Sequence, residues 1–258
     1  MSLRIFFPSN NYLADLTKNY NFISAEIDLV RIGENENIID LLNNNEVDLA
    51  LIDPLTYSSI SGEYEFAIVP TKCLVAAGYT GIASIYFAKY LREIESIAFD
   101  AQNKYFALLT SIILKEKYSF ETQITELTET SIKDLKNFDA IISTNQFEGY
   151  NNSLDFTEEW FDTFEFPLPI AFWVAPEHYD YDTITKITEL LYDINKTENE
   201  ITDVQKDTGS SYEQEGMIIN QFSDEIIKYL EEIIQLFFQL GLIENMKDIR
   251  ILGSEDIN

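Results

Sequence analysis

Polar side chains that could bind and orient an anionic molecule follow several predicted strands of this chain. They are Ser9, Asn10 and Asn11 after strand 4–8, Thr80 and Ser84 around the start of strand 82–87, Asn103 and Lys104 after strand 96–100, and Thr144 and Asn145 after strand 139–143. Their hydroxyl, amide and ammonium groups donate hydrogen bonds to carboxylate oxygens. Ligands of α/β proteins bind beside the carboxyl ends of strands. The set as a whole therefore indicates a ligand site, although each residue alone also suits an ordinary helix cap or turn.

Signatures of other chemistries are absent from the sequence. There is no Gly-x-Gly-x-x-Gly and no Walker A motif, so the usual phosphate loops give no support for nucleotide binding. One histidine and one cysteine exclude the usual zinc sites. His178 lies in a Pro-Glu-His-Tyr segment that is typical of a surface loop, and Cys73 lies in an apolar run typical of a buried strand.

The composition limits the partners. The chain has 258 residues, 46% of them hydrophobic, which is enough for a substantial core. Its formal net charge of -28 disfavours nucleic acid and anionic membrane surfaces, and the simplest interpretation of the acidity is solubility. No apolar run is long enough to span a membrane, and the first residues show no signal peptide, so we expect a cytoplasmic protein. The oligomeric state is not predicted.

Strand-like and helix-like segments alternate along most of the chain, which predicts an α/β fold. Asp53-Pro54 after the buried run 48–52 is a specific helix start, because aspartate caps the helix and proline suits its first position. The clearest helix covers residues 222–240. Residues 195–212 are acidic and weakly periodic, and their structure is left open.

Three stretches of the chain carry a family resemblance. VDLALIDPLTYSS at 47–59, the run 67–118, and DFTEEWFDTFEFPLPIAFWVAP at 155–176 resemble, in order and spacing, the menaquinone-biosynthesis family of the futalosine route, which includes chorismate dehydratase. The last stretch holds both tryptophans of the chain, Trp160 and Trp173. The resemblance covers most of the chain and is weaker after about residue 181.

The resemblance implies a periplasmic-binding-protein-like fold of type II. Two α/β domains would be joined by two crossover strands, near residues 80–87 and 170–175, with a ligand cleft between them. The expected division is 1–82 with 173–258 as domain I and 83–172 as domain II.

The resemblance also implies an activity, the dehydration of chorismate by a carbon–oxygen lyase without a cofactor. Asn11 and Ser84 would be the catalytic residues, and Lys104 would take a substrate carboxylate. The remaining substrate-binding residues would be Ser9, Asn10, Thr80, Asn103, Thr144 and Asn145.

The ligand-binding motifs depart from the family pattern more than the scaffold does. The family's Ser-Tyr-Leu-Asn corresponds to Ser9-Asn10-Asn11-Tyr12, with the asparagine shifted, and its Ser-Arg-Thr-Ser corresponds to Asn103-Lys104-Tyr105-Phe106. Ile-Gly-Asp becomes Ser143-Thr144-Asn145, and Thr-Gly becomes Phe164-Glu165. Two hypotheses therefore remain: a chorismate dehydratase-like enzyme, and a diverged, non-catalytic protein of the same fold that binds a small molecule.

Overall fold

The computed structural model describes residues 3–17, 27–33, 38–60, 65–88, 93–148, 150, 152–194, 199–207 and 213–254. The chain divides into two compact units. Unit 1 contains Met1–Val75, Pro169–Thr202 and Ile219–Asn258, and unit 2 contains Ala76–Leu168 and Asp203–Ile218. The predicted division differs from this partition chiefly because residues 203–218 group with unit 2.

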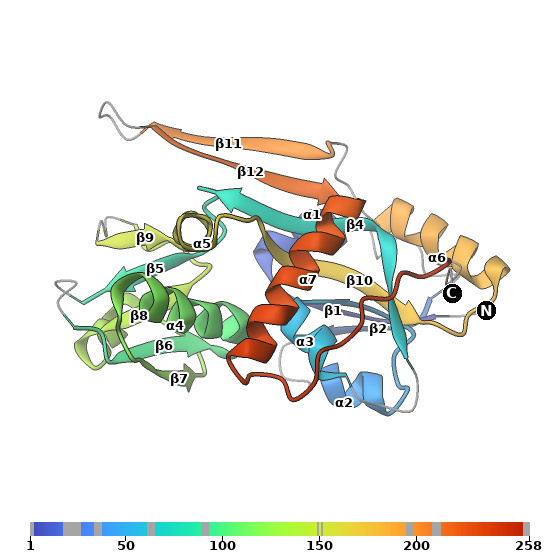
Figure 1. Cartoon of the computed structure of the whole chain (residues 1–258), viewed down its shortest axis with the longest axis horizontal. Helices are drawn as coiled ribbons and strands as arrows, with labels where there is room; N and C mark the ends of the chain where they lie inside the picture. Colours follow the sequence, from blue (N-terminus) through green and yellow to red (C-terminus); the bar gives the residue numbers. More distant parts are fainter. Residues whose placement is uncertain are drawn as a thin grey trace. The chain divides into compact units, whose positions relative to one another are not determined.

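The first sheet has the strand order β11-β12-β4-β10-β3-β1-β2 (Figure 1). Its strands are β1 (Leu3–Pro8), β2 (Ile27–Gly33), β3 (Leu49–Ile52), β4 (Phe66–Gly78), β10 (Leu168–Pro176), β11 (Ile201–Asp207) and β12 (Glu213–Gln221). β1 runs parallel to β2 and β3, and β10 runs antiparallel to β3. The helices of this part of the chain are η1 (Asn11–Leu13), α1 (Ala14–Thr17), α2 (Ile38–Asn43), α3 (Pro54–Ser59), α6 (Tyr181–Ile194) and α7 (Asp224–Gln239).

The second sheet belongs to unit 2 and has the order β7-β6-β8-β5-β9. Its strands are β5 (Ser84–Phe87), β6 (Ser96–Asp100), β7 (Gln123–Leu127), β8 (Ala140–Ser143) and β9 (Ser153–Asp155). β6 runs parallel to β7 and β8, whereas β5 runs antiparallel to β8 and β9. Four helices accompany it: η3 (Ala101–Asn103), α4 (Lys104–Tyr118), η4 (Ile132–Lys136) and α5 (Phe156–Phe164).

The two sheets repeat one topology. In each sheet three parallel strands lie side by side with the earliest of the three in the middle, followed by an antiparallel strand and then a fifth strand: β2-β1-β3-β10-β4 in the first sheet and β7-β6-β8-β5-β9 in the second. This order is that of the type II periplasmic-binding-protein-like fold, so the predicted fold class is confirmed.

Local signals explain several element boundaries. The carboxylate of Asp53 accepts the backbone N–H of Thr56 at 2.8 Å, and Pro54 opens α3, as the sequence predicts. The predicted helix at 222–240 is α7, whose buried face contains Ile226, Leu230 and Ile233. Among the described residues, no helix combines the length and apolar character that a membrane span requires.

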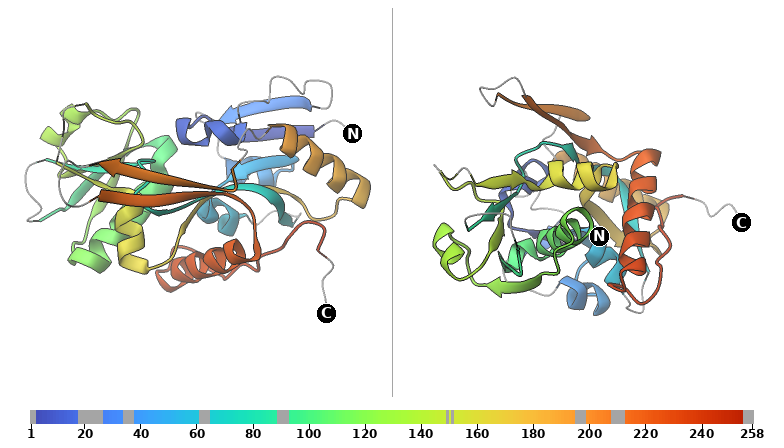
Figure 2. Two further views of the ribbon diagram at one scale, coloured as in Figure 1. Left: turned by 90° about the horizontal axis from the view of Figure 1, so that it is seen from above. Right: turned by 60° about the vertical axis from the view of Figure 1, so that its left-hand side comes forward.

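The hairpin formed by β11 and β12 is the main element that the sequence did not predict. It lies in the acidic segment 195–212 and beyond, of which residues 195–198 and 208–212 fall outside the described residues. Figures 1 and 2 show the two strands as long orange arrows. Its side chains are mostly exposed or half-buried, so it lacks the apolar alternation by which a strand is recognised.

Residues 203–218 of the hairpin belong to unit 2 and contact residues 78 and 79 through backbone atoms. The N–H of Tyr79 donates to the carbonyl of Glu215 at 3.0 Å. A β-carbon added at Gly216 would lie 2.0 Å from the carbonyl oxygen of Tyr79, and one added at Gly78 would lie 2.6 Å from that of Glu215. Glycine is therefore required at position 216 because the two backbones approach so closely.

Candidate functional site

Several predicted site residues meet at one edge of the unit 2 sheet. Ser84, the first residue of β5, lies opposite Ser143 of β8 on one side and Asp155 of β9 on the other. Because β5 runs antiparallel to these strands, its first residue lies at their carboxyl ends. We call this edge, with Thr80, Ser84, Asp100, Asn103, Thr130, Ser143, Asp155 and Thr157, the polar edge.

Asp155 is the most heavily hydrogen-bonded carboxylate of the polar edge. It caps α5: its Oδ1 accepts the backbone N–H groups of Thr157 and Glu158, each at 3.0 Å. Its Oδ2 accepts the N–H of Gly81 at 2.8 Å. Burial raises the pKa of Asp155, although these donors oppose the shift. The carboxylate thus ties the turn before β5 to the start of α5.

Thr80 and Thr157 form a buried hydroxyl pair beside Asp155. Their oxygens lie 2.7 Å apart, and Thr157 Oγ1 also lies 2.7 Å from Asp155 Oδ1 and 2.8 Å from the carbonyl of Gly78. Through these contacts Thr157 links Thr80 to the start of α5. Thr80 therefore helps to fix the turn that presents Ser84, in addition to its predicted role in binding.

Asp100 and Asn103 form a second cluster where β6 ends. Asn103 Nδ2 donates to Asp100 Oδ1 at 2.8 Å, and Thr130 Oγ1 donates to Asp100 Oδ2 at 3.2 Å. Burial raises the pKa of Asp100, with these donors opposing it. Asn103 is only 2% exposed, and its Oδ1 has no hydrogen-bond partner in the described part of the chain.

The remaining predicted residues of unit 2 lie around the polar edge and are more open. Lys104 is exposed and begins α4. Thr144 is half-buried and Asn145 is exposed; the N–H of Asn145 donates to Ser143 Oγ at 3.1 Å, and its carbonyl accepts Tyr86 Oη at 3.2 Å.

The predicted residues Ser9, Asn10 and Asn11 belong to unit 1 and follow β1. Asn10 is buried, and its Nδ2 donates to Tyr12 Oη at 2.8 Å. Ser9 and Asn11 are exposed, and Asn11 begins the short helix η1. Their roles in catalysis and binding stay predictions, as do those of the unit 2 residues.

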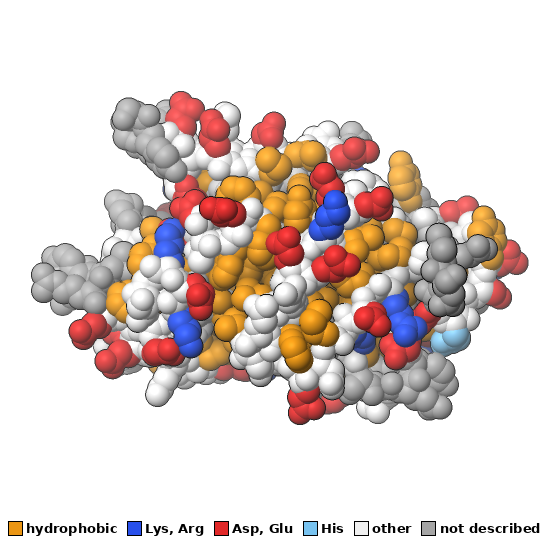
Figure 3. Space-filling view, viewed as in Figure 1, with side chains coloured by type: hydrophobic (Ala, Val, Ile, Leu, Met, Phe, Trp, Pro, Cys, Tyr) orange, Lys and Arg blue, Asp and Glu red, His pale blue; other side chains and the backbone are white. Residues whose placement is uncertain are grey.

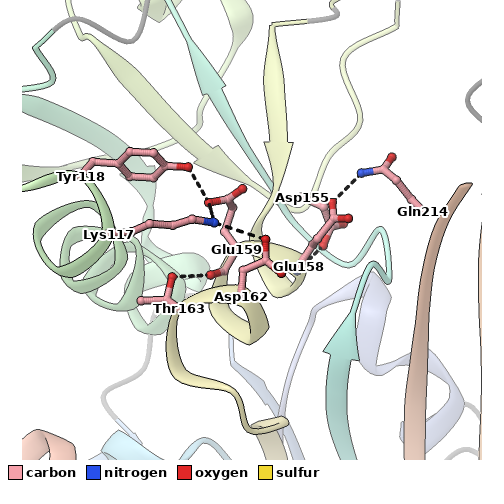
Figure 4. Close-up of polar contacts among 8 residues, drawn as sticks. All are labelled: Lys117, Tyr118, Asp155, Glu158, Glu159, Asp162, Thr163 and Gln214. Carbon is pink, nitrogen blue, oxygen red and sulfur yellow. Dashed lines mark hydrogen bonds and ion pairs between the residues drawn. The ribbon is translucent and has the colours of Figure 1, made fainter. Parts of the chain in front are cut away.

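A partly buried ionic network joins α5, and with it Asp155, to α4 (Figure 4). Glu159, which is buried, accepts hydrogen bonds from Lys117 Nζ at 2.9 Å and Tyr118 Oη at 2.8 Å. Glu158, which precedes Glu159 in α5, accepts a hydrogen bond from the side-chain amide of Gln214 of β12 at 2.5 Å. Burial opposes the charge of Lys117, but its pKa is raised because the contact with Glu159 favours the ammonium. The network fixes the helix that Asp155 caps.

Sequence reasoning missed Asp155, Asp100 and Thr130. Asp155 had a visible signal, because an aspartate followed three residues later by Glu158 before an apolar run is a helix-start pattern. The Asp100–Thr130 contact joins residues 30 positions apart and had no local signal. Within the described ranges, no group of three or more His, Cys, Asp or Glu side chains is arranged to hold a metal ion.

The surface of the protein carries more acidic than basic side chains, as expected from 45 Asp and Glu residues against 17 Lys and Arg residues. Figure 3 shows red carboxylates scattered over the visible face and few blue cations. An anionic ligand would therefore depend on local donors rather than on the general field.

Comparisons with known proteins identify a family and a fold. A family model described as menaquinone biosynthesis matches residues 20–238. The chain is similar to the crystal structure of protein AF1704 from Archaeoglobus fulgidus, with a TM-score of 0.59 and 13% identity over 94% of this chain and 98% of that one. It is less similar to protein PG110 from Staphylococcus aureus, with a TM-score of 0.43 and 11% identity over 89% and 99% of the two chains. At these identities a structural likeness concerns the fold alone. No curated protein matches the chain significantly.

Proposed function

The chain belongs to the menaquinone biosynthesis family, and from that membership we propose that it acts in this pathway as a chorismate dehydratase-like carbon–oxygen lyase on a small anionic substrate. The proposal includes a cytoplasmic location and a ligand that binds between the two units. The observation that carries it is the position of Ser84 between Ser143 and Asp155 at the carboxyl ends of the strands.

Dehydration of chorismate removes a ring proton and the ring hydroxyl, which leave together as water, and produces an aromatic enolpyruvyl-oxybenzoate. Ser84 would orient the substrate, Asn11 would lie near the departing proton, and Lys104 would pair with a carboxylate. Neither serine nor asparagine is a strong base. Positioning of the substrate, with one of its own carboxylates as the base, would therefore supply much of the rate.

A second candidate function is binding without catalysis. It is favoured by the charge of the polar edge, where Asp100 and Asp155 lie among the binding groups while Lys104 is exposed. Two carboxylates weaken the binding of a doubly anionic substrate unless one of them is protonated, and the pKa of each is raised.

Incubation of the purified protein with chorismate separates the two candidates. The enzyme proposal expects formation of the enolpyruvyl-oxybenzoate, measured by absorbance and mass spectrometry, and loss of this activity in Ser84→Ala. A thermal shift with chorismate and no turnover supports the binding protein. The absence of both a thermal shift and turnover with chorismate would contradict the enzyme proposal.

A further inference from the structure

Asn103 lies where the resembled family carries Ser-Arg-Thr-Ser, and its environment differs from that of a carboxylate-binding residue. Two side chains at the end of β6 donate hydrogen bonds to the carboxylate of Asp100. They are the amide of Asn103, at 2.8 Å, and the hydroxyl of Thr130, at 3.2 Å. The backbone N–H of Gln102 also donates to this carboxylate. Asp100 therefore accepts three hydrogen bonds from this cluster.

The contact with Asp100 fixes the orientation of the Asn103 amide. The nitrogen faces the carboxylate, because the opposite orientation would place two acceptor oxygens together. The amide oxygen therefore points away from Asp100. It is buried and has no partner among the described residues. A buried acceptor without a donor is unfavourable, so a donor that arrives with a ligand would be bound strongly.

The location of the cluster agrees with a ligand contact. Asp100 and Asn103 follow β6, the neighbour of β8 in the sheet, and β8 ends at Ser143 opposite Ser84. The exposed Lys104 comes next in the chain. The same edge thus offers one cation for an acidic group and one acceptor for a donor group.

We propose that Asn103 Oδ1, held in place by Asp100, accepts a hydrogen bond from a ligand hydroxyl and so selects a hydroxylated substrate. This inference rests on the proposed function, because it needs a ligand at the polar edge. It assigns Asn103 to a hydroxyl rather than to a carboxylate. Removal of the ligand hydroxyl leaves the acceptor unsatisfied and should weaken binding by about tenfold or more.

Chorismate and its dehydration product form a matched pair for the test, because the product lacks the ring hydroxyl. Affinities of both would be measured by stopped-flow detection of the binding phase, which precedes turnover of chorismate, for the wild type, for Asn103→Leu, and for Gln102→Leu, which changes an exposed amide one residue away. We expect the wild type and Gln102→Leu to bind chorismate about tenfold more tightly than the product. Asn103→Leu should bind the two equally, because only its affinity for chorismate falls.

The outcomes distinguish this inference from the proposed function. If both compounds bind and Asn103→Leu retains the wild-type preference for chorismate, or if the wild type shows no preference, the hydroxyl contact is wrong while the function stands. If neither compound binds to the wild type, the proposed function fails, and the inference fails with it. Circular dichroism confirms that each variant folds; if Asn103→Leu does not, Asn103→Ala provides the same comparison.

Discussion

Asp155 Oδ2 accepts the backbone N–H of Gly81 at 2.8 Å, although the two residues lie 74 positions apart in the chain. Through its other oxygen the same carboxylate caps α5. One side chain therefore fixes both the turn that leads to Ser84 and the helix that follows β9.

Replacement of Asp155 by alanine should destabilise the protein by about 2 kcal/mol or more. The loss of a helix cap costs about 1 kcal/mol, and the N–H of Gly81 loses its acceptor at a further cost of about 1–3 kcal/mol. Urea unfolding followed by circular dichroism measures the change. As a control, Asp180→Ala removes the exposed carboxylate that accepts the N–H of Thr183 and should cost less. Equal losses in the two variants would contradict the role given to Asp155.

Ser84→Ala should lower chorismate turnover by at least about tenfold without lowering the melting temperature, because the half-buried Ser84 side chain makes no hydrogen bonds within the described ranges comparable with those of Asp155. Ser254→Ala, which changes an exposed serine far along the chain, serves as the matched control and should keep full activity. Unchanged turnover in Ser84→Ala would remove this residue from the proposed mechanism.

Gly216→Ala should displace the hairpin of β11 and β12 from Gly78 and Tyr79, because the added methyl group would lie 2.0 Å from the carbonyl oxygen of Tyr79. Gly241→Ala is an informative control: nothing lies within 4 Å of its added carbon, and only its φ of +71° opposes the change. We expect faster limited proteolysis within the hairpin for Gly216→Ala alone. Identical digestion of both variants would show that the close approach is not required.

Glu159→Gln should destabilise the protein by about 1–3 kcal/mol, because Lys117 and Tyr118 lose the charged acceptor that the buried Glu159 provides. Lys115 and Glu121 form an exposed pair, with side chains 51% and 81% accessible, and Glu121→Gln should change the free energy of unfolding by less than about 1 kcal/mol. A thermal or chemical unfolding series of both variants checks the difference, and similar values would argue against a structural role for Glu159.

The ion pair between Arg4 and Asp48 should make stability depend on acid pH. Burial alone would raise the pKa of Asp48, but its hydrogen bonds to Arg4 outweigh burial and lower the pKa below its ordinary 3.8. The folded state therefore favours the carboxylate more than the unfolded state does. This contribution is complete above about pH 5 and is lost as the pH falls through the lowered value. Asp48→Asn should flatten the acid side of the stability curve, and an unchanged slope would contradict this assignment.

Much of the fold could be predicted from the sequence because its signals are local. Asp53-Pro54 marks the start of α3, and the alternation of buried strands with amphipathic helices indicates the α/β class. The hairpin was not predicted, because contacts between backbones leave no pattern of side chains.

The candidate site was predicted in part for the same reason. Residues directly after strands, such as Asn103 and Asn145, could be named from their position. Asp155 and Thr130 act through partners distant in the sequence, Gly81 and Asp100, and such pairs appear only in three dimensions.

The dependence of Tyr79 on Glu215 limits how the gene can be dissected. Unit 2 is assembled from two separate stretches, and the N–H of Tyr79 finds its acceptor only in the second. A fragment that contains only residues 76–168 would lack that acceptor and the strand β12 that carries it. Such a fragment should be prone to aggregation when it is expressed. Joining 76–168 to 203–218 by a short linker should restore a soluble fragment. The smallest part of the chain expected to fold as unit 2 is therefore encoded by two separate stretches of the gene.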